Sequence, residues 1–201
     1  MIHITVATGN PGKAAEFNRI LETLPGELRA QLPEGGMPRV DETADTFEGN
    51  ARLKAEALSR QVSGWVVADD SGLQVDALGG EPGVHSARYG EPDHPGLDDA
   101  GRRGLLLDRM KEVAEPDRAA QFVCVLALAQ DGKVEAVFSG ECRGVIVAAG
   151  EERGSSGFGY DPVFLFPGAG RTFAEMEPAE KDRYSHRGKA LWRLAAHLTG
   201  I

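Results

Sequence analysis

A glycine-containing segment near the start of the chain has the composition of a phosphate-binding loop. It joins an alternating apolar strand to a helix, so backbone N–H groups and the positive end of the helix dipole would face a phosphate. The spacing differs from that of the Walker loop, because its glycine and lysine lie too close together. A tight turn followed by a lysine at a helix start is the alternative. The segment is Thr8, Gly9, Asn10, Pro11, Gly12 and Lys13.

Two acidic pairs could bind a divalent cation. Asp41-Glu42 lies in an early loop, and Asp69-Asp70 follows a short apolar run with Ser71 next to it. Adjacent carboxylates at the end of an apolar strand repel each other unless a cation or hydrogen-bond donors compensate them. Mg²⁺ prefers oxygen ligands and commonly binds through one or two carboxylates together with substrate phosphates. The alternative is that Asp69, Asp70 and Ser71 simply cap a turn.

A third group combines donors with aromatic rings. Lys181 and the sequence Ser185-His186-Arg187 place donors near a predicted helix start, where Ser185 is a suitable N-cap. Phe158 and Tyr160, in a loop with Gly159 and Asp161, offer stacking faces for a nucleobase. Basic residues at a helix start are often merely solvated, so both interpretations remain open.

The elements that would position these residues alternate between strand and helix. Residues 2–6 predict a strand and residues 14–24 a helix, while Asp45 with Glu48 predicts the N-cap of a helix to about residue 62. Residues 65–68 predict a short buried strand that ends at the acidic pair, which would then lie in a loop at its carboxyl end.

The second half of the chain predicts more strand. After a glycine- and proline-rich loop over 79–96, a helix is expected from about Asp98. Strands are expected at 121–129, 134–139 and 142–147, the first two joined at Asp131-Gly132 as a hairpin. A short helix near Pro178 and a last helix from Ser185 complete the chain.

Composition limits the class of protein. The chain has 201 residues, which predicts one globular domain over 1–201 or two closely packed lobes. Its net charge of −9 disfavours binding to nucleic-acid polymers or anionic membranes. We see no signal peptide and no apolar run long enough to span a bilayer. Cys124 and Cys142 lie in strand-like segments without zinc-type spacing, so we expect a reducing cytoplasm.

Taken together, five motifs in order along nearly the whole chain resemble the inosine/xanthosine triphosphate pyrophosphatases. This family hydrolyses non-canonical purine nucleoside triphosphates, such as ITP, dITP and XTP, to the monophosphate and pyrophosphate. The motifs are TGNPGK at 8–13, ADDSG at 68–72, LGGEPGVHSARY at 78–89, GFGYDPVF at 157–164 and SHRGKA at 185–190.

The resemblance implies an α/β fold with an elongated mixed central sheet flanked by helices, two lobes with a nucleotide cleft between them, and a homodimer. It implies Mg²⁺ as cofactor, Asp70 as general base and metal ligand, and Glu42, rather than Asp41, as the upstream ligand. The chain has Asp41-Glu42 where the family often has Glu-Glu, and Gly49 where a Glu is common. The residues implied to bind substrate are Thr8 to Lys13, Lys54, Ser71, Phe158, Gly159, Tyr160, Asp161, Lys181, Ser185, His186 and Arg187.

In the expected reaction, either Asp70 or a metal-bound hydroxide activates water for attack at the α-phosphorus. Arg187 selects the base by donating to the 6-carbonyl of hypoxanthine. Two other functions remain open. A related pyrophosphatase for modified pyrimidine or methylated nucleotides would differ in the base pocket around Phe158 and Arg187. A non-catalytic nucleotide-binding regulator is expected to lack Asp70, Lys13 or the upstream acid, all of which this chain has.

Overall fold

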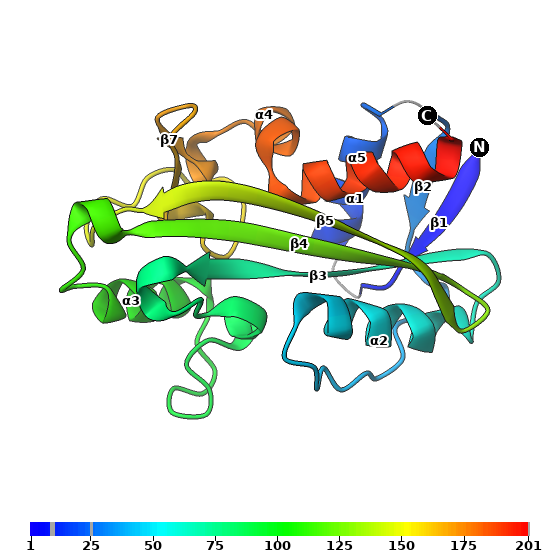
Figure 1. Cartoon of the computed structure of the whole chain (residues 1–201), viewed down its shortest axis with the longest axis horizontal. Helices are drawn as coiled ribbons and strands as arrows, with labels where there is room; N and C mark the ends of the chain where they lie inside the picture. The colour runs from blue at the N-terminus through cyan, green and yellow to red at the C-terminus, as the bar shows by residue number, and fades with distance from the viewer. Residues whose placement is uncertain (9–10, 25, 201) are drawn as a thin grey trace. The chain divides into compact units, whose positions relative to one another are not determined.

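The computed structural model describes residues 1–8, 11–24 and 26–200 and has an α/β fold (Figure 1). Its seven-stranded sheet has the order β2-β1-β3-β4-β5-β6-β7. The strands are β1 (Ile2–Val6), β2 (Leu28–Gln31), β3 (Trp65–Val75), β4 (Ala119–Gln130), β5 (Lys133–Ile146), β6 (Phe164–Phe166) and β7 (Arg171–Thr172). The α-helices are α1 (Pro11–Leu21), α2 (Phe47–Ser59), α3 (Asp99–Arg109), α4 (Pro178–Tyr184) and α5 (His186–Thr199).

The sheet is mixed, as predicted. Strand β1 pairs in parallel with both β2 and β3, whereas β6 pairs antiparallel with both β5 and β7. A parallel pair needs a crossover connection, and α1 and α2 lie in the connections that join these parallel strands. The N-terminal half therefore consists of strand–helix–strand units, which bring the start of α1 next to the end of β1.

Two compact units divide the chain, and their boundaries fall inside β3, β4 and β5. Unit 1 contains residues 1–71, 124–140 and 185–201, and unit 2 contains residues 72–123 and 141–184. In unit 1, α1 and α5 lie on one face of the sheet and α2 on the opposite face (Figure 1). The core on the α1 and α5 face includes Phe17, Val67, Leu126, Leu191 and Leu194.

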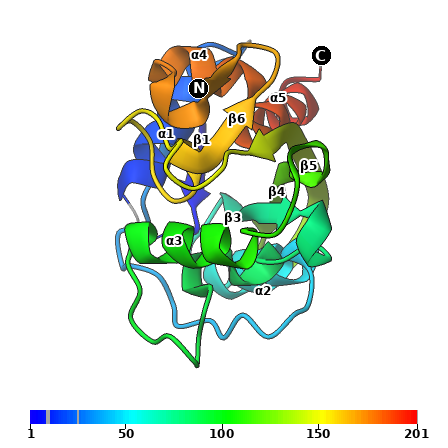
Figure 2. The same ribbon diagram turned by 90° about the vertical axis from the view of Figure 1, so that its left-hand side faces the viewer.

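Unit 2 has an apolar core of its own. Helix α3 packs below the strands of this unit (Figure 2) and contributes Leu106, Leu107 and Met110 to that core. Three aromatic rings pack beside them, with the Phe122 ring centroid 4.6 Å from Phe164 and 5.8 Å from Phe173. Each unit thus buries its own apolar side chains. This packing fixes the strands and helices that carry the predicted site residues.

The main difference from the sequence-based expectation concerns β3. We expected a short strand ending at the acidic pair, but β3 continues through Asp69 and Asp70 to Val75. The strand continues because Leu73 and Val75 are fully buried in the core of unit 2 and because each carboxylate has a cationic neighbour within unit 1. The loop placement of the acidic pair was therefore wrong.

Smaller differences concern a strand and a cap. The strands expected at 134–139 and 142–147 form the single strand β5. The N-cap of α2 is Thr46, whose side chain accepts from the Gly49 amide, rather than Asp45. The hairpin turn was predicted correctly, since Asp131 and Gly132 both have positive φ, as a two-residue type I′ turn requires.

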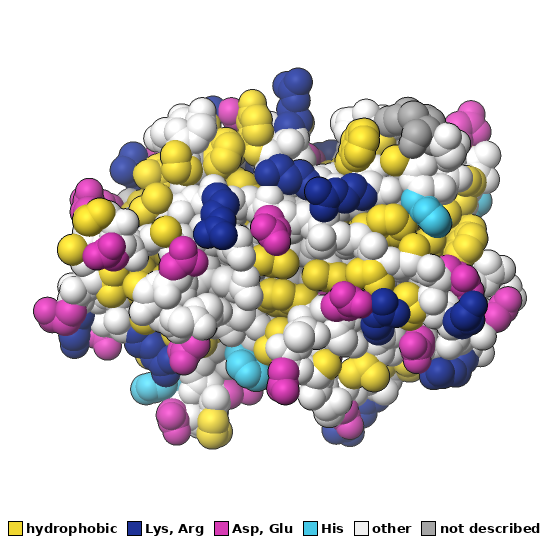
Figure 3. All heavy atoms as spheres, in the orientation of Figure 1, with side chains coloured by type: hydrophobic (Ala, Val, Ile, Leu, Met, Phe, Trp, Pro, Cys, Tyr) yellow, Lys and Arg dark blue, Asp and Glu magenta, His cyan; other side chains and the backbone are white. Residues whose placement is uncertain are grey.

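None of the helices in the described ranges is long and apolar enough to cross a membrane. On the face of the molecule in Figure 3, acidic and basic side chains are interspersed rather than gathered by sign. Cys124 and Cys142 are both buried, as their strand positions predicted.

The close approach of α5 to β5 gives a test of the packing in unit 1. A Cβ atom added at Gly140 would lie 2.1 Å from the backbone oxygen of His186, so Gly140→Ala must displace the first turn of α5. We expect a loss of about 1–3 kcal/mol in unfolding free energy. The matched control is Gly104→Ala at an exposed position of α3, where an added Cβ would have no atom within 4 Å and a gain of about 0.5–1 kcal/mol is expected. Equal effects of the two substitutions in urea unfolding would contradict this packing.

Candidate active site

The alternation of side chains along β3 separates the two adjacent aspartates. Successive residues of a strand point to opposite faces, so Asp69 shares a face with Val67 and Ser71, while Asp70 points the other way. Val67 belongs to the core that α1 and α5 cover, whereas Asp70 contacts Lys54 of α2. The sequence predicted one acidic cluster, but the strand produces two carboxylates with different partners.

Asp69 is the centre of a buried ionic network. Its Oδ1 accepts from Lys13 Nζ at 3.0 Å and from Ser71 Oγ at 2.9 Å, and its Oδ2 accepts from Arg187 Nε at 2.8 Å. Burial alone would raise the pKa of Asp69, but the charges of Arg187 and Lys13 outweigh it and hold the pKa well below its usual value. Asp69 is therefore ionised at neutral pH and fixes Lys13 beside β3.

Arg187 is the largest fully buried side chain, with 1% of its surface exposed. Besides Asp69, its Nη1 donates to Glu16 Oε2 at 2.8 Å and its Nη2 donates to Ser71 Oγ at 2.9 Å. All three guanidinium nitrogens thus bond to groups of unit 1. The guanidinium already holds two carboxylates and a hydroxyl, and the predicted contact of Arg187 with a nucleobase stays a prediction. The sequence analysis missed Glu16, whose only signal is its position one turn after Lys13 on α1.

Asp70 and Glu42 share the ammonium group of Lys54. Lys54 Nζ lies 2.7 Å from Asp70 Oδ1 and 3.1 Å from Glu42 Oε1. The other oxygen, Asp70 Oδ2, is buried and has no hydrogen-bond partner among the described residues. A buried carboxylate oxygen without a donor is destabilising unless a ligand or cation compensates it, so this oxygen marks a position where one is expected.

The pKa values of Asp70 and Lys54 are both raised, but for different reasons. Burial raises the pKa of Asp70, and the negative charges of Glu42 and Asp69 add to the effect of burial, while Lys54 opposes it. Burial lowers the pKa of Lys54, but two carboxylates on its ammonium outweigh this, and the net pKa is raised. One cation thus serves several carboxylates, and the proton affinity of Asp70 is increased, as a general base requires.

The structure distinguishes the two upstream acids. Asp41 is exposed and lies 3.8 Å from Arg39 Nε, whereas Glu42 points toward Lys54. Asn50 of α2 supports this loop, because its Oδ1 accepts from the Ala44 amide at 3.0 Å. Glu42 is therefore the acid whose side chain joins Asp70, and Asn50 is a further positioning residue that the sequence analysis left unassigned.

These groups fit a divalent cation of the magnesium type. Among the described residues, no cluster of three His, Cys, Asp or Glu could hold a metal by itself. Two carboxylates around one ammonium show that this position accepts a positive charge, and Mg²⁺ commonly takes one or two carboxylates plus substrate phosphates. Asp70 and Glu42 could hold such an ion only with oxygens from water or substrate.

The predicted phosphate-binding segment follows β1 and includes the first turn of α1. The Thr8 amide donates to the Val6 carbonyl at 2.8 Å, and Gly12 is exposed in the first turn of α1. Pro11 is the first residue of α1, a position that suits its fixed φ. Gly9 and Asn10 lie outside the described residues, and their phosphate contacts stay predictions.

The start of α5 has the predicted capping geometry. Ser185 is the N-cap, and its buried Oγ accepts from the Gly188 amide at 3.0 Å. His186, the first residue of α5, is 5% exposed. In unit 1, two of the predicted residues, Asp70 and Ser71, thus lie in β3, and Lys13 and Lys54 contact aspartates of that strand. Ser185 and His186 lie at the start of α5, which also carries Arg187.

The predicted base-binding residues of unit 2 form a compact cluster. Asp161 Oδ2 accepts from Lys181 Nζ at 2.6 Å and from the Phe158 amide at 2.9 Å. The Phe158 ring is 49% exposed, and Lys181 Nζ lies 5.2 Å from its centroid. Tyr160 is instead buried, and its hydroxyl donates to the Ser86 carbonyl at 2.9 Å. Phe158 is thus the ring available for stacking, and Tyr160 anchors the loop.

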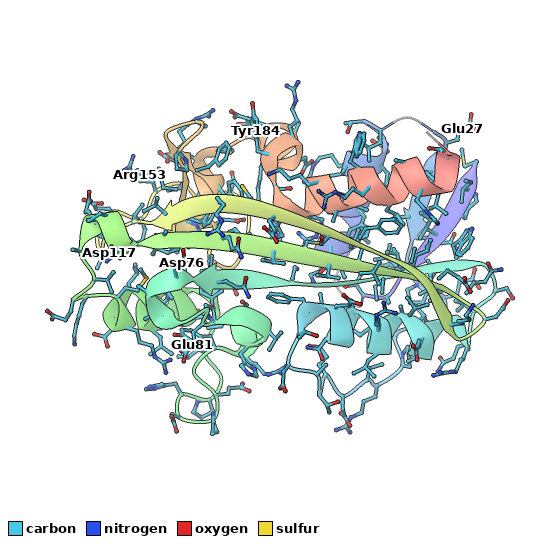
Figure 4. The ribbon with its side chains drawn as sticks, viewed as in Figure 1. Glu27, Asp76, Glu81, Asp117, Arg153 and Tyr184 are labelled. Carbon is cyan, nitrogen blue, oxygen red and sulfur yellow. The ribbon has the colours of Figure 1, made fainter. Side chains whose placement is uncertain are left out.

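A second feature of unit 2 was not predicted. The loop over 81–93 surrounds a cavity of about 500 Å³ that none of the predicted site residues lines. Glu81, labelled in Figure 4, accepts from Arg109 Nη1 at 2.6 Å and from the Tyr89 hydroxyl at 3.1 Å. These contacts explain the order of this glycine- and proline-rich segment.

Similarity to known proteins agrees with the geometry. The model of the Ham1 family matches residues 4–197. A dITP/XTP pyrophosphatase of Thermosynechococcus vestitus is 49% identical over 194 residues, which cover 96% of this chain and 93% of that protein.

Solved structures give the same result. A HAM1 protein of Coxiella burnetii is 38% identical, with a TM-score of 0.86 and full coverage of both chains. A nucleoside-triphosphatase / dITP/XTP pyrophosphatase of Mycobacterium abscessus is 41% identical, with a TM-score of 0.73 and coverage of 96% of this chain and 98% of that one. With its family model matched almost from end to end and its buried acidic strand in place, the chain belongs to the Ham1 family.

Proposed function

We propose that this protein is a nucleoside-triphosphate pyrophosphatase that hydrolyses ITP, dITP and XTP to the monophosphate and pyrophosphate. Its activity would keep deaminated purines out of DNA and RNA. The observation that carries the proposal is the buried Asp70 Oδ2, which has no hydrogen-bond partner within the described ranges, beside the shared ammonium of Lys54. Relatives named dITP/XTP pyrophosphatases support the choice of substrate.

The cations of unit 1 would bind the triphosphate. Lys13 is paired with Asp69 but keeps 26% of its side chain exposed, so its ammonium remains accessible to an incoming phosphate. Lys54 holds Asp70 and Glu42, and it would be available to phosphate oxygens if these two carboxylates held a metal ion. The segment from Thr8 to Lys13 would add backbone N–H groups at the start of α1. We expect Ser71 to contact substrate.

Asp70 would act as general base on the attacking water. Its raised pKa suits a group that must accept a proton near neutral pH, and its position in a strand restricts its movement. We infer that Asp70 and Glu42 hold Mg²⁺, which when bound would neutralise charge on the phosphate oxygens. Pyrophosphate would leave as the bond between the α-phosphorus and its bridging oxygen breaks.

For Arg187, the contacts favour a role different from the predicted one. Its guanidinium holds Asp69, Glu16 and Ser71, so we propose that it positions these side chains rather than contacting the base. The loop with Phe158, Gly159 and Asp161, together with Lys181, would then bind the base. We expect Ser185 and His186, at the start of α5, to contact the substrate.

Several properties remain predictions from the composition or from the resemblance. These are assembly as a homodimer, a cytoplasmic location, a single functional domain over 1–201, and a nucleotide cleft between two lobes. A pyrophosphatase for modified pyrimidines remains the rival function. Pyrophosphate release from a panel of ITP, dITP, XTP, GTP, ATP and modified pyrimidine triphosphates tests the proposal, and it would be wrong if the deaminated purines are not preferred.

Substitution of the proposed base should abolish turnover. We expect Asp70→Asn to lower kcat at least about 10²–10⁴-fold, because it removes the proton acceptor and a proposed metal ligand together. Pyrophosphate release by the purified variant measures this. The matched control is Asp76→Asn in unit 2, an exposed aspartate paired with Arg143, which should keep the wild-type rate.

The same variant should not be less stable than wild type. A carboxyl whose pKa is raised by folding gives stability that is present below its unfolded pKa and is lost as the pH rises through its folded pKa. At neutral pH the ionised Asp70 therefore reduces stability, and Asn removes that charge. A melting temperature below that of wild type at pH 7 would contradict the assigned direction of the pKa shift.

Lys13 should matter for the phosphate chain and not for the nucleoside. Lys13→Ala is expected to weaken ITP binding by about 10-fold or more, because a charged hydrogen bond contributes about 1.5–3 kcal/mol, and to leave inosine binding unchanged. Calorimetric titration with both ligands measures the difference. Lys133→Ala at the exposed hairpin is the control, and equal weakening of both ligands by Lys13→Ala would indicate a damaged loop instead.

For Arg187, stability and selectivity separate the two roles. Arg187→Met leaves Asp69 and Glu16 as buried carboxylates without their cation, which should reduce unfolding free energy by about 3–5 kcal/mol. Hydrolysis of ITP and ATP by the folded fraction should fall by the same factor. A selective loss of the ITP preference without loss of stability would restore the prediction that Arg187 contacts the base.

A further inference from the structure

The loop that carries Phe158 is held from a second direction by α3. Gly159 follows Phe158, and its amide donates to Asp99 Oδ2 at 2.8 Å. The carbonyl of the same residue accepts from Arg103 Nη1 at 2.7 Å. Both polar groups of one loop residue are therefore bonded to side chains of a single helix.

The spacing on α3 makes this arrangement possible. Asp99 and Arg103 are four residues apart, so they lie on the same face of the helix, one turn from each other. Asp98 caps the helix by accepting from the Gly101 amide at 2.8 Å, and Arg102 pairs with Asp99 Oδ1. The pKa of Asp99 is lowered: burial acts against this, but the Gly159 amide and Arg102 outweigh it. Asp99 is thus an ionised acceptor in a fixed position.

The loop itself would be poorly ordered without such contacts. Gly154, Gly157 and Gly159 all have positive φ, and glycine loses more conformational freedom on ordering than any other residue. On one side of Phe158 the backbone is fixed through Asp161, which accepts from the Phe158 amide. On the other side it is fixed at Gly159 by α3. The exposed ring lies between these two fixed points.

We propose that Asp99 and Arg103 are positioning residues that set the orientation of the Phe158 ring for nucleobase stacking. The proposal rests on the proposed function, because it assigns the ring to the base of the substrate. Both contacts to Gly159 lie within unit 2. Their loss should therefore change base affinity and leave the chemistry at Asp70 intact.

The test uses Asp99→Ala and Arg103→Met in the full chain. Each should raise the KM for ITP about 10-fold with kcat changed by less than about 2-fold, as expected for the loss of one hydrogen bond that orders the binding group. The inhibition constant of inorganic tripolyphosphate, which has no base, should remain unchanged. Asp99→Asn keeps an acceptor oxygen and should restore most of the affinity for ITP.

Asp98→Ala is the matched control. It removes the N-cap of the same helix and so destabilises α3, but it leaves both contacts to Gly159 in place. We expect its melting temperature to fall about as much as that of Asp99→Ala, with the KM for ITP unchanged. A KM that rises equally in Asp98→Ala would show that helix stability, and not the Gly159 contacts, controls base binding and would overturn the proposal.

Hydrogen exchange separates this proposal from the proposed function. The Gly159 amide should exchange at least 10-fold faster in Asp99→Ala than in wild type, whatever the substrate. Slow exchange in both proteins, or unchanged KM values for ITP in an active enzyme, would overturn the positioning role. Failure of the wild type to hydrolyse ITP, dITP and XTP would instead overturn the proposed function, even if the Gly159 amide depends on Asp99.

Discussion

The separation of Asp69 and Asp70 onto opposite faces of one strand is the constraint on which the site of unit 1 depends. Two adjacent buried carboxylates would repel strongly if they shared an environment, and strand alternation gives each its own cation. Asp69 is compensated by Arg187 and Lys13, so its role is structural. In the part of the chain that the structure describes, Asp70 shares one lysine and has an oxygen without a hydrogen-bond partner, which leaves it able to bind a proton or a metal.

The surrounding elements follow from this separation. Asp69 requires a helix on its face that supplies a guanidinium, and α5 places Arg187 there. Glu16 of α1 also binds Arg187, and its negative charge balances the additional positive charge of Lys13. Asp70 requires α2 on the other face, where Lys54 also holds Glu42. A buried ionic network of this kind is costly to break because each remaining charge would be left unpaired. The network therefore fixes α1, α5 and β3 in one arrangement within unit 1.

Unit 2 solves a different problem, which is to present an aromatic ring on a glycine-rich loop. Glycines allow the tight path of the backbone but leave it with high conformational freedom. Side chains of neighbouring elements restrict that freedom: Asp161 and Lys181 hold one end of the loop, and α3 holds Gly159. A preorganised ring loses less entropy when a base stacks on it, which favours affinity. Order in this loop thus comes from tertiary contacts and not from local sequence preference.

The sequence by itself determined the family, the α/β class and the candidate residues, because motifs such as TGNPGK and SHRGKA depend on local residue types. It also predicted the Asp131-Gly132 hairpin and the Ser185 cap, whose geometry follows from neighbouring residues. Tertiary structure alone decided that β3 continues past Asp70, that Arg187 is enclosed by Asp69 and Glu16, and that Asp99 reaches Gly159. These are contacts between residues far apart in the chain, and the charge or hydrogen-bond partner that stabilises each residue is not encoded in its own segment.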